Sequence, residues 1–80
     1  MTNLNSQIDS LARVQERIED KIANLEEKQE ALEDKANDHD RDLTDREQEL
    51  YDKYEDEIEE LRDEFDTIQN AIDYLMDYAE

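Results

Sequence analysis

The chain contains no cysteine, no glycine and no proline, and its only aromatic residues are four tyrosines and one phenylalanine. The lack of cysteine excludes disulfide frameworks, thiol chemistry and cysteine zinc sites, and it favours a cytoplasmic protein. The lack of glycine and proline removes the residues that usually end helices and form turns. These absences together favour long, uninterrupted helices.

Apolar runs and positive charges are scarce as well. No apolar stretch approaches the roughly 20 residues that cross a bilayer, so we expect no membrane segment. The chain has 27 Asp and Glu against 9 Lys and Arg, which gives a net charge of −18. Such a charge repels nucleic acids and anionic lipids. We therefore expect its partners to be basic proteins and other copies of itself.

The apolar residues recur at alternating steps of three and four, which is the heptad pattern of a coiled coil. The pattern is regular enough to favour helical order over disorder, although acidic composition alone would suggest disorder. Gln15 and Gln29 occupy two of the inward a positions. Polar a residues weaken a coiled coil, but they also fix its register. The sequence therefore predicts an all-α fold.

Charged residues that flank this apolar stripe, which is the seam of a coiled coil, favour parallel pairing of two copies. Lys21, Lys28 and Lys35 fall at heptad position g, and glutamates occupy position e. In a parallel homodimer each g lysine faces an e carboxylate of the partner, whereas two antiparallel copies would set like charges against each other. The pattern predicts a long acidic helix that forms a parallel coiled-coil dimer.

The chain becomes a poorer helix former after residue 36. Residues 37–40 are Asn-Asp-His-Asp, the heptad register then shifts by one residue, and Thr44 with Glu47 forms a candidate capping box. Two architectures follow. A continuous rod about 110 Å long is favoured, because no glycine or proline marks a turn and the g–e pairing has no use in a hairpin. The alternative is a two-helix hairpin hinged near residues 37–42.

We interpret the chain as a single helical domain, 1–80, with four segments. They are a coiled-coil zipper (1–36), a weak point or hinge (37–43), an acidic helix (44–66) and an apolar segment for oligomerisation or docking (67–80). The predicted oligomer interface consists of Ile8, Leu11, Ile18, Ile22, Leu25, Leu32, Leu43, Ile58, Leu61, Phe65, Ile68, Ile72 and Leu75.

Negative charge concentrates between residues 38 and 66, where 15 carboxylates and four cations give a net charge of −11. Two parallel helical copies of this segment would carry about −22 over about 43 Å, against roughly 25 charges on duplex DNA of that length. We expect this acidic face to bind a basic partner. Its predicted binding residues are Asp38, Asp40, Asp42, Asp45, Glu49, Asp52, Glu55, Asp56, Glu59, Glu60, Asp63 and Asp66.

Catalytic and metal-binding patterns fail on inspection. His39 is the only histidine, and it has no nucleophile or concave site to serve. An EF-hand spacing begins at Asp38, but Leu43 stands where the loop needs glycine, and Asp45 stands where an apolar residue is usual. We therefore expect no enzyme, cofactor or specific metal site.

The function favoured by the sequence is a non-enzymatic nucleic-acid mimic that inhibits a basic DNA- or RNA-binding protein. A phage counter-defence protein would fit this description. The alternative is a structural coiled-coil spacer or assembly factor. Adaptation to high salt would acidify the whole chain evenly, whereas here residues 1–37 carry only −4 and residues 67–80 only −3.

Overall fold

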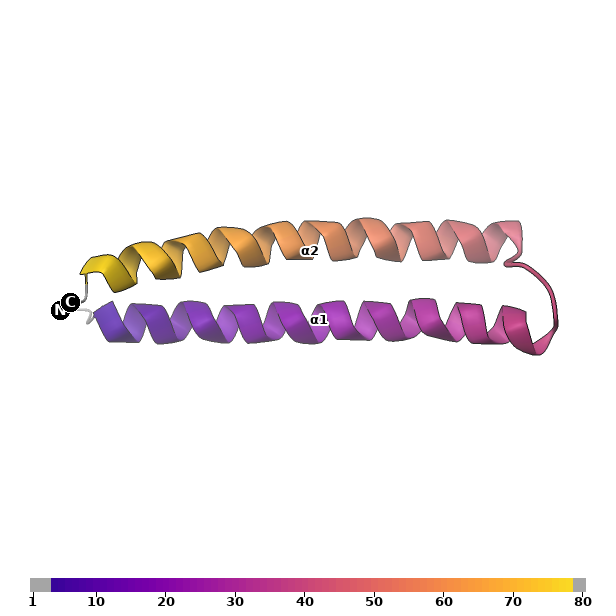
Figure 1. Cartoon of the computed structure of the whole chain (residues 1–80), viewed down its shortest axis with the longest axis horizontal. Helices are drawn as coiled ribbons and strands as arrows, with labels where there is room; N and C mark the ends of the chain where they lie inside the picture. The colour runs from indigo at the N-terminus through magenta and orange to yellow at the C-terminus, as the bar shows by residue number, and fades with distance from the viewer. Residues whose placement is uncertain (1–3, 79–80) are drawn as a thin grey trace.

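The computed structural model describes residues 4–78, which form two α-helices joined by a turn (Figure 1). Helix α1 spans Leu4–Asp38 and helix α2 spans Asp45–Tyr78. The helices run antiparallel and side by side over a molecule of 58 × 17 × 16 Å. The predicted all-α class is confirmed. Neither described helix combines the length and apolar content that a membrane span requires.

The favoured prediction of a continuous rod is wrong, and the chain forms the alternative hairpin. Its longest dimension is 58 Å rather than about 110 Å. Residues of the 1–36 segment pair with α2 of the same chain, so the parallel dimer predicted from that segment loses its basis. The one-residue shift in heptad register needs no helix distortion, because two separate helices each keep their own frame.

Helix α1 ends without glycine because Asp40 adopts the conformation that glycine usually supplies. Its φ is 54°, in the left-handed region that Asp reaches more easily than most residues. The amide of Arg41 donates to the carbonyl of Ala36 (3.0 Å), and the amide of Asp40 donates to that of Asn37 (3.0 Å). These two bonds form a Schellman C-cap, after which the chain can reverse.

Helix α2 begins at the predicted capping box, which is confirmed. The amide of Thr44 donates to Glu47 Oε1 (2.9 Å), and the amide of Glu47 donates to Thr44 Oγ1 (3.2 Å). This reciprocal pair satisfies backbone donors that a helix start leaves free. The turn therefore occupies residues 39–44, next to the hinge expected near 37–42.

Gln15 fixes the register of α1 against α2. Its Nε2 donates to Gln69 Oε1 (2.9 Å) and to the carbonyl of Phe65 (3.4 Å). A buried amide can make this pair of bonds at one alignment only, so the contact opposes sliding of the two helices.

Gln29 repeats the same contact fourteen residues further along both helices. Its Nε2 donates to Glu55 Oε2 (2.9 Å) and to the carbonyl of Tyr51 (3.2 Å). In both cases one amide bridges a backbone carbonyl and the side chain four residues later. We call these two contacts the glutamine clamps.

The core is a thin seam between the helices. Its buried apolar side chains are Ile18, Leu25, Ala36, Ile58 and Ile72. The thirteen residues predicted for an oligomer interface are all buried or half-buried within the single hairpin. One chain therefore uses, for its own two helices, the residues that the sequence assigned to pairing between chains.

Candidate interaction surfaces

Glu47 is the central residue of the turn and is only 8% exposed. Its carboxylate accepts hydrogen bonds from Arg41 Nη1 (2.8 Å) and Nη2 (3.4 Å), and Lys35 Nζ lies 3.9 Å away. The hydrogen bond from Arg41, followed by that from the Thr44 amide, lowers the pKa of Glu47 to about 2. The ionised carboxylate thereby ties the end of α1 to the start of α2.

Replacing Glu47 by glutamine should make the hairpin less stable at neutral pH and hardly change it near pH 2. The folded-state pKa of Glu47 is below its ordinary value of 4.5. Its contribution is therefore complete above pH 4.5 and disappears as the pH falls toward about 2. Thermal melts of both proteins across this range check the prediction. A difference in melting temperature that stayed constant down to pH 2 would contradict it.

A line of nine carboxylates and one asparagine runs along the outer face of α2, and we call it the outer ridge. Its members follow steps of four and three residues, so they stay on one side of the helix along its length. The outer ridge consists of Asp45, Glu49, Asp52, Asp56, Glu59, Asp63, Asp66, Asn70, Asp73 and Asp77. All ten side chains are exposed, and they follow one another at about 5 Å along the helix axis.

The outer ridge is not neutralised by the protein itself. Within residues 4–78, the ion pairs are those of Lys35 and Arg41 with Glu47, which lies on the inward side of α2. Two ridge carboxylates accept amide hydrogen bonds, Asp52 from Gln48 (2.9 Å) and Asp73 from Gln69 (3.0 Å). The ridge carboxylates therefore take part in no ion pair within the described residues.

The predicted acidic face divides in the structure. Seven of its twelve residues lie on the outer ridge, namely Asp45, Glu49, Asp52, Asp56, Glu59, Asp63 and Asp66. Asp38, Asp40 and Asp42 lie around the turn, Glu60 lies beside the ridge, and half-buried Glu55 belongs to a glutamine clamp. The prediction missed Asp73 and Asp77, although the same three-and-four spacing could have found them.

Lysines gather along one edge of the seam between the two helices. We call this edge the lysine edge. Its residues stand at heptad position g on both helices. They are Val14, Lys21, Lys28 and Lys35 on α1, with Leu50, Glu57, Glu64 and Ala71 on α2. Lys28 Nζ lies 5.6 Å from the centre of the Tyr54 ring, a cation–π distance. Lys21, Lys28 and Glu57 line one shallow depression.

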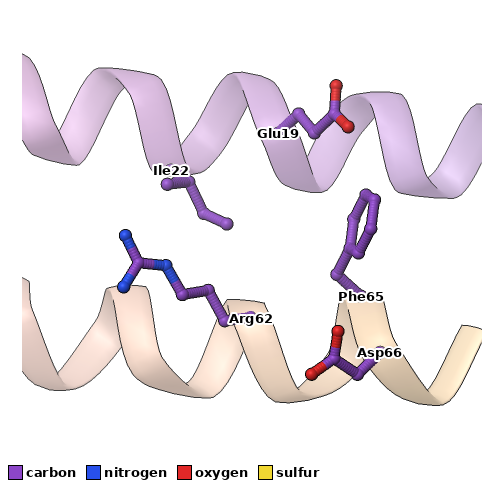
Figure 2. A pocket seen from close by; sticks show the side chains of 5 residues that line it. All are labelled: Glu19, Ile22, Arg62, Phe65 and Asp66. Carbon is purple, nitrogen blue, oxygen red and sulfur yellow. The ribbon is translucent and has the colours of Figure 1, made fainter. Parts of the chain in front are cut away.

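The other edge of the seam is acidic. Figure 2 shows one depression on it, where Ile22 and Phe65 point into the space between the helices and Arg62 extends toward α1. Glu19 and Asp66 complete its rim. The depression is open and shallow, so it holds no enclosed volume for a small ligand.

Aromatic residues gather at the end of α2, within the predicted 67–80 segment. Tyr74 and Tyr78 are 62% and 65% exposed, and their ring centroids are 5.0 Å apart. Their hydroxyls lie 3.2 Å apart, and this hydrogen bond is the first cause that raises the pKa of Tyr74. The start of α1 lies at the same end of the hairpin (Figure 1).

Among residues 4–78, no group of three or more His, Cys, Asp or Glu side chains is arranged to hold a metal ion. No family model, curated protein or solved structure matches the chain. The surfaces themselves are therefore the basis for any functional assignment.

Proposed function

We propose that this is a non-enzymatic, cytoplasmic binding protein whose outer ridge occupies the basic cleft of a DNA- or RNA-binding protein in place of the nucleic acid. The observation that carries the proposal is the ridge itself. Nine carboxylates and one asparagine follow one another over about 48 Å, and none of these ten positions holds a cation.

The linear charge density of the hairpin supports this proposal. Residues 4–78 carry −5 on α1, −1 on the turn and −11 on α2, a total of −17 over a molecule 58 Å long. That is one charge per about 3.4 Å, the axial spacing of phosphates along one strand of a nucleic acid. The near-duplex density expected for two parallel rods does not apply to a single hairpin. One hairpin instead resembles a single strand in charge per unit length.

Carboxylates can replace phosphates in a site built from arginine and lysine. A guanidinium group donates two parallel hydrogen bonds to either group, and a lysine ammonium binds either as a point charge. Because the ridge carboxylates are exposed and free of ion pairs within the described residues, a partner need not break internal contacts of the hairpin to reach most of them.

Converting four ridge carboxylates to amides should weaken partner binding by about 100-fold or more, if two of them make charge-assisted hydrogen bonds of roughly 1.5–3 kcal/mol each. The variant is Asp52→Asn, Asp56→Asn, Glu59→Gln and Asp63→Asn. Wild type and variant, immobilised, would be incubated with cell lysate at about 0.05 M and about 0.5 M NaCl. We expect basic nucleic-acid-binding proteins to be retained by the wild type at low salt and displaced by excess DNA or RNA.

The matched control removes four exposed carboxylates from α1, namely Glu16→Gln, Asp20→Asn, Glu27→Gln and Asp34→Asn. It has the same net charge as the ridge variant but an intact ridge, and we expect it to bind like the wild type. If both variants weakened partner binding equally, overall charge rather than the ridge would be responsible. Retained proteins that excess nucleic acid cannot displace would overturn the proposal.

A structural assembly role is the second candidate, and the exposed end of α2 favours it. Tyr74, Met76 and Tyr78 are at least half exposed, and aromatic and Met side chains are common at interface centres. A partner docked on this end would be held by apolar contact. Its retention at about 0.5 M NaCl, with loss on Tyr74→Ala and Tyr78→Ala, would favour assembly over mimicry.

A further inference from the structure

Burial is uneven between the two edges of the seam. Heptad position a lies beside the acidic edge. Five of its residues are buried, namely Gln15, Gln29, Ala36, Ile58 and Ile72, and four are half-buried, namely Ile8, Ile22, Tyr51 and Phe65. Position d lies beside the lysine edge. Ile18 and Leu25 are buried there, and seven residues are only half-buried: Leu4, Leu11, Leu32, Tyr54, Leu61, Ile68 and Leu75. More half-buried apolar side chains therefore lie beside the lysine edge than beside the acidic edge.

Other observations mark the same edge as apolar. Val14 and Leu50, two of its members, are each 38% exposed. Leu25 and Leu61 line the central depression, which Lys21, Lys28 and Glu57 also border, and Leu11 and Leu75 line another depression nearer the chain ends. This partly exposed apolar strip thus runs along much of the hairpin.

The lysine edge also differs in charge from the rest of the molecule. Its three lysines and two glutamates give a net charge of +1, whereas residues 4–78 together carry −17. A second copy of this chain repels the first over its acidic surfaces, but it can approach this edge without that repulsion.

We propose that two hairpins pair through their lysine edges into a four-helix bundle, with a two-fold axis parallel to the long axis of the hairpin. This axis sets α1 of each copy against α2 of the other. Because Lys21, Lys28 and Glu57 border the same depression, Glu57 of one copy then faces the lysine row of the other between Lys21 and Lys28. One heptad further along, Glu64 faces the same row between Val14 and Lys21.

A two-fold axis across the length would instead set lysine against lysine and glutamate against glutamate. Like charges in contact are unfavourable, so the charge pattern selects the lengthwise axis. The outer ridges stay on the outside of the bundle, so the pairing does not depend on the proposed function.

The size of the surface and the thin core both favour a second copy as the occupant. A face of 58 by 17 Å has a projected area of about 1,000 Å², which leaves room for the roughly 800 Å² that each partner buries in a standard interface. The hairpin buries only five apolar side chains among its described residues, and the sequence has no cysteine to add a disulfide. Small domains of this kind commonly gain stability by oligomerisation.

Sedimentation equilibrium of the full chain tests the pairing. We expect a dimer for the wild type and a dissociation constant at least about 100-fold higher for Lys21→Glu with Lys28→Glu. The matched control, Arg13→Glu with Arg17→Glu, makes the same charge change on exposed residues of the same helix and should remain dimeric. Circular dichroism verifies that each variant is helical. If Lys21→Glu with Lys28→Glu is not helical, Lys21→Gln with Lys28→Gln takes its place.

A complementary variant gives a rescue experiment. Glu57→Lys with Glu64→Lys should also fail to dimerise alone, because its lysine row would face a second lysine row. Mixed in equal amounts, the two variants should form a heterodimer, since each supplies the charge that the other lacks. A wild type that stayed monomeric up to about 1 mM, or a dimer that neither variant weakened, would overturn the proposal.

The direction of the axis has its own measurement. The chain has no native cysteine, so His39→Cys offers a single labelling site at the turn. With the lengthwise axis both turns lie at one end, and spin labels should be within about 30 Å, because neighbouring helices of a bundle lie about 10 Å apart. A separation near the 58 Å length of the hairpin would show the opposite arrangement and overturn this part of the proposal.

Discussion

Replacing Ile58 by aspartate should unfold the hairpin. Ile58 is 1% exposed, the most completely buried large side chain in the described part of the chain. Truncation of a buried isoleucine alone costs about 2–5 kcal/mol, and an unpaired carboxylate buried in its place adds further cost. Small domains have only about 5–15 kcal/mol of stability in total. Circular dichroism at 25 °C should therefore show loss of most of the helical signal.

Met76→Asp is the control for this experiment. It adds the same negative charge to the same helix, but Met76 is 50% exposed, so the new carboxylate stays hydrated. We expect this variant to keep its helical signal, with a melting temperature close to that of the wild type. If both variants melted alike, Ile58 would not be packed between the two helices.

Replacing both clamp glutamines by leucine should raise the melting temperature by about 10 °C. Gln15 and Gln29 are buried, so leucine would gain apolar burial at a position of similar volume. The side chains of Gln69 and Glu55 would lose one hydrogen bond each, but both are half-buried and can turn to water. A net gain of about 1 kcal/mol per site corresponds to roughly 4–8 °C in a chain of this size.

The same substitution should lower the uniqueness of the structure. Polar residues at a positions commonly fix register at some cost in stability. Without the clamps, sedimentation velocity should show several associated species instead of one. Ala23→Leu with Ala31→Leu, which adds two leucines at exposed positions of α1, is the control and should leave the melting temperature nearly unchanged. A clamp variant that melted below the wild type would mean that the hydrogen bonds outweigh the apolar gain.

Much of the fold could be predicted from the sequence, because helical periodicity and capping are local properties. The inward residues and the Thr44–Glu47 capping box follow from spacing alone. The choice between rod and hairpin could not be predicted in this way. It depends on Asp40 adopting a left-handed conformation, which is uncommon for a residue other than glycine.

The lysines misled the prediction of pairing for a physical reason. Their g positions suit a parallel dimer, but the hairpin uses them equally well. Lys28 lies over the ring of Tyr54, and Lys35 lies 3.9 Å from the carboxylate of Glu47. A charge pattern that satisfies two architectures cannot decide between them.

The excess of carboxylates could be predicted from the sequence, but their arrangement in one line along α2 could not. Counting charges in one window included Glu55, which is drawn into a clamp, and it excluded Asp73 and Asp77, which lie outside the window. Only the orientation of α2 against α1 shows which carboxylates share one line along the helix. That orientation depends on contacts between residues distant in the sequence, such as Gln15 and Gln69.

Because the glutamine clamps repeat at a fixed spacing, we expect that the hairpin can be shortened or lengthened only in steps of whole heptads. The clamps are two heptads apart on both helices, and each uses the same geometry. Removal of one heptad from α1 and one from α2 between the clamps, such as residues 16–22 and 58–64, would leave both clamps aligned and shorten the hairpin by about 10 Å. A deletion in only one helix would bring one glutamine opposite the wrong turn. We therefore expect the hairpin to tolerate insertions and deletions as matched pairs of seven residues, because such pairs keep the two helices equal in length.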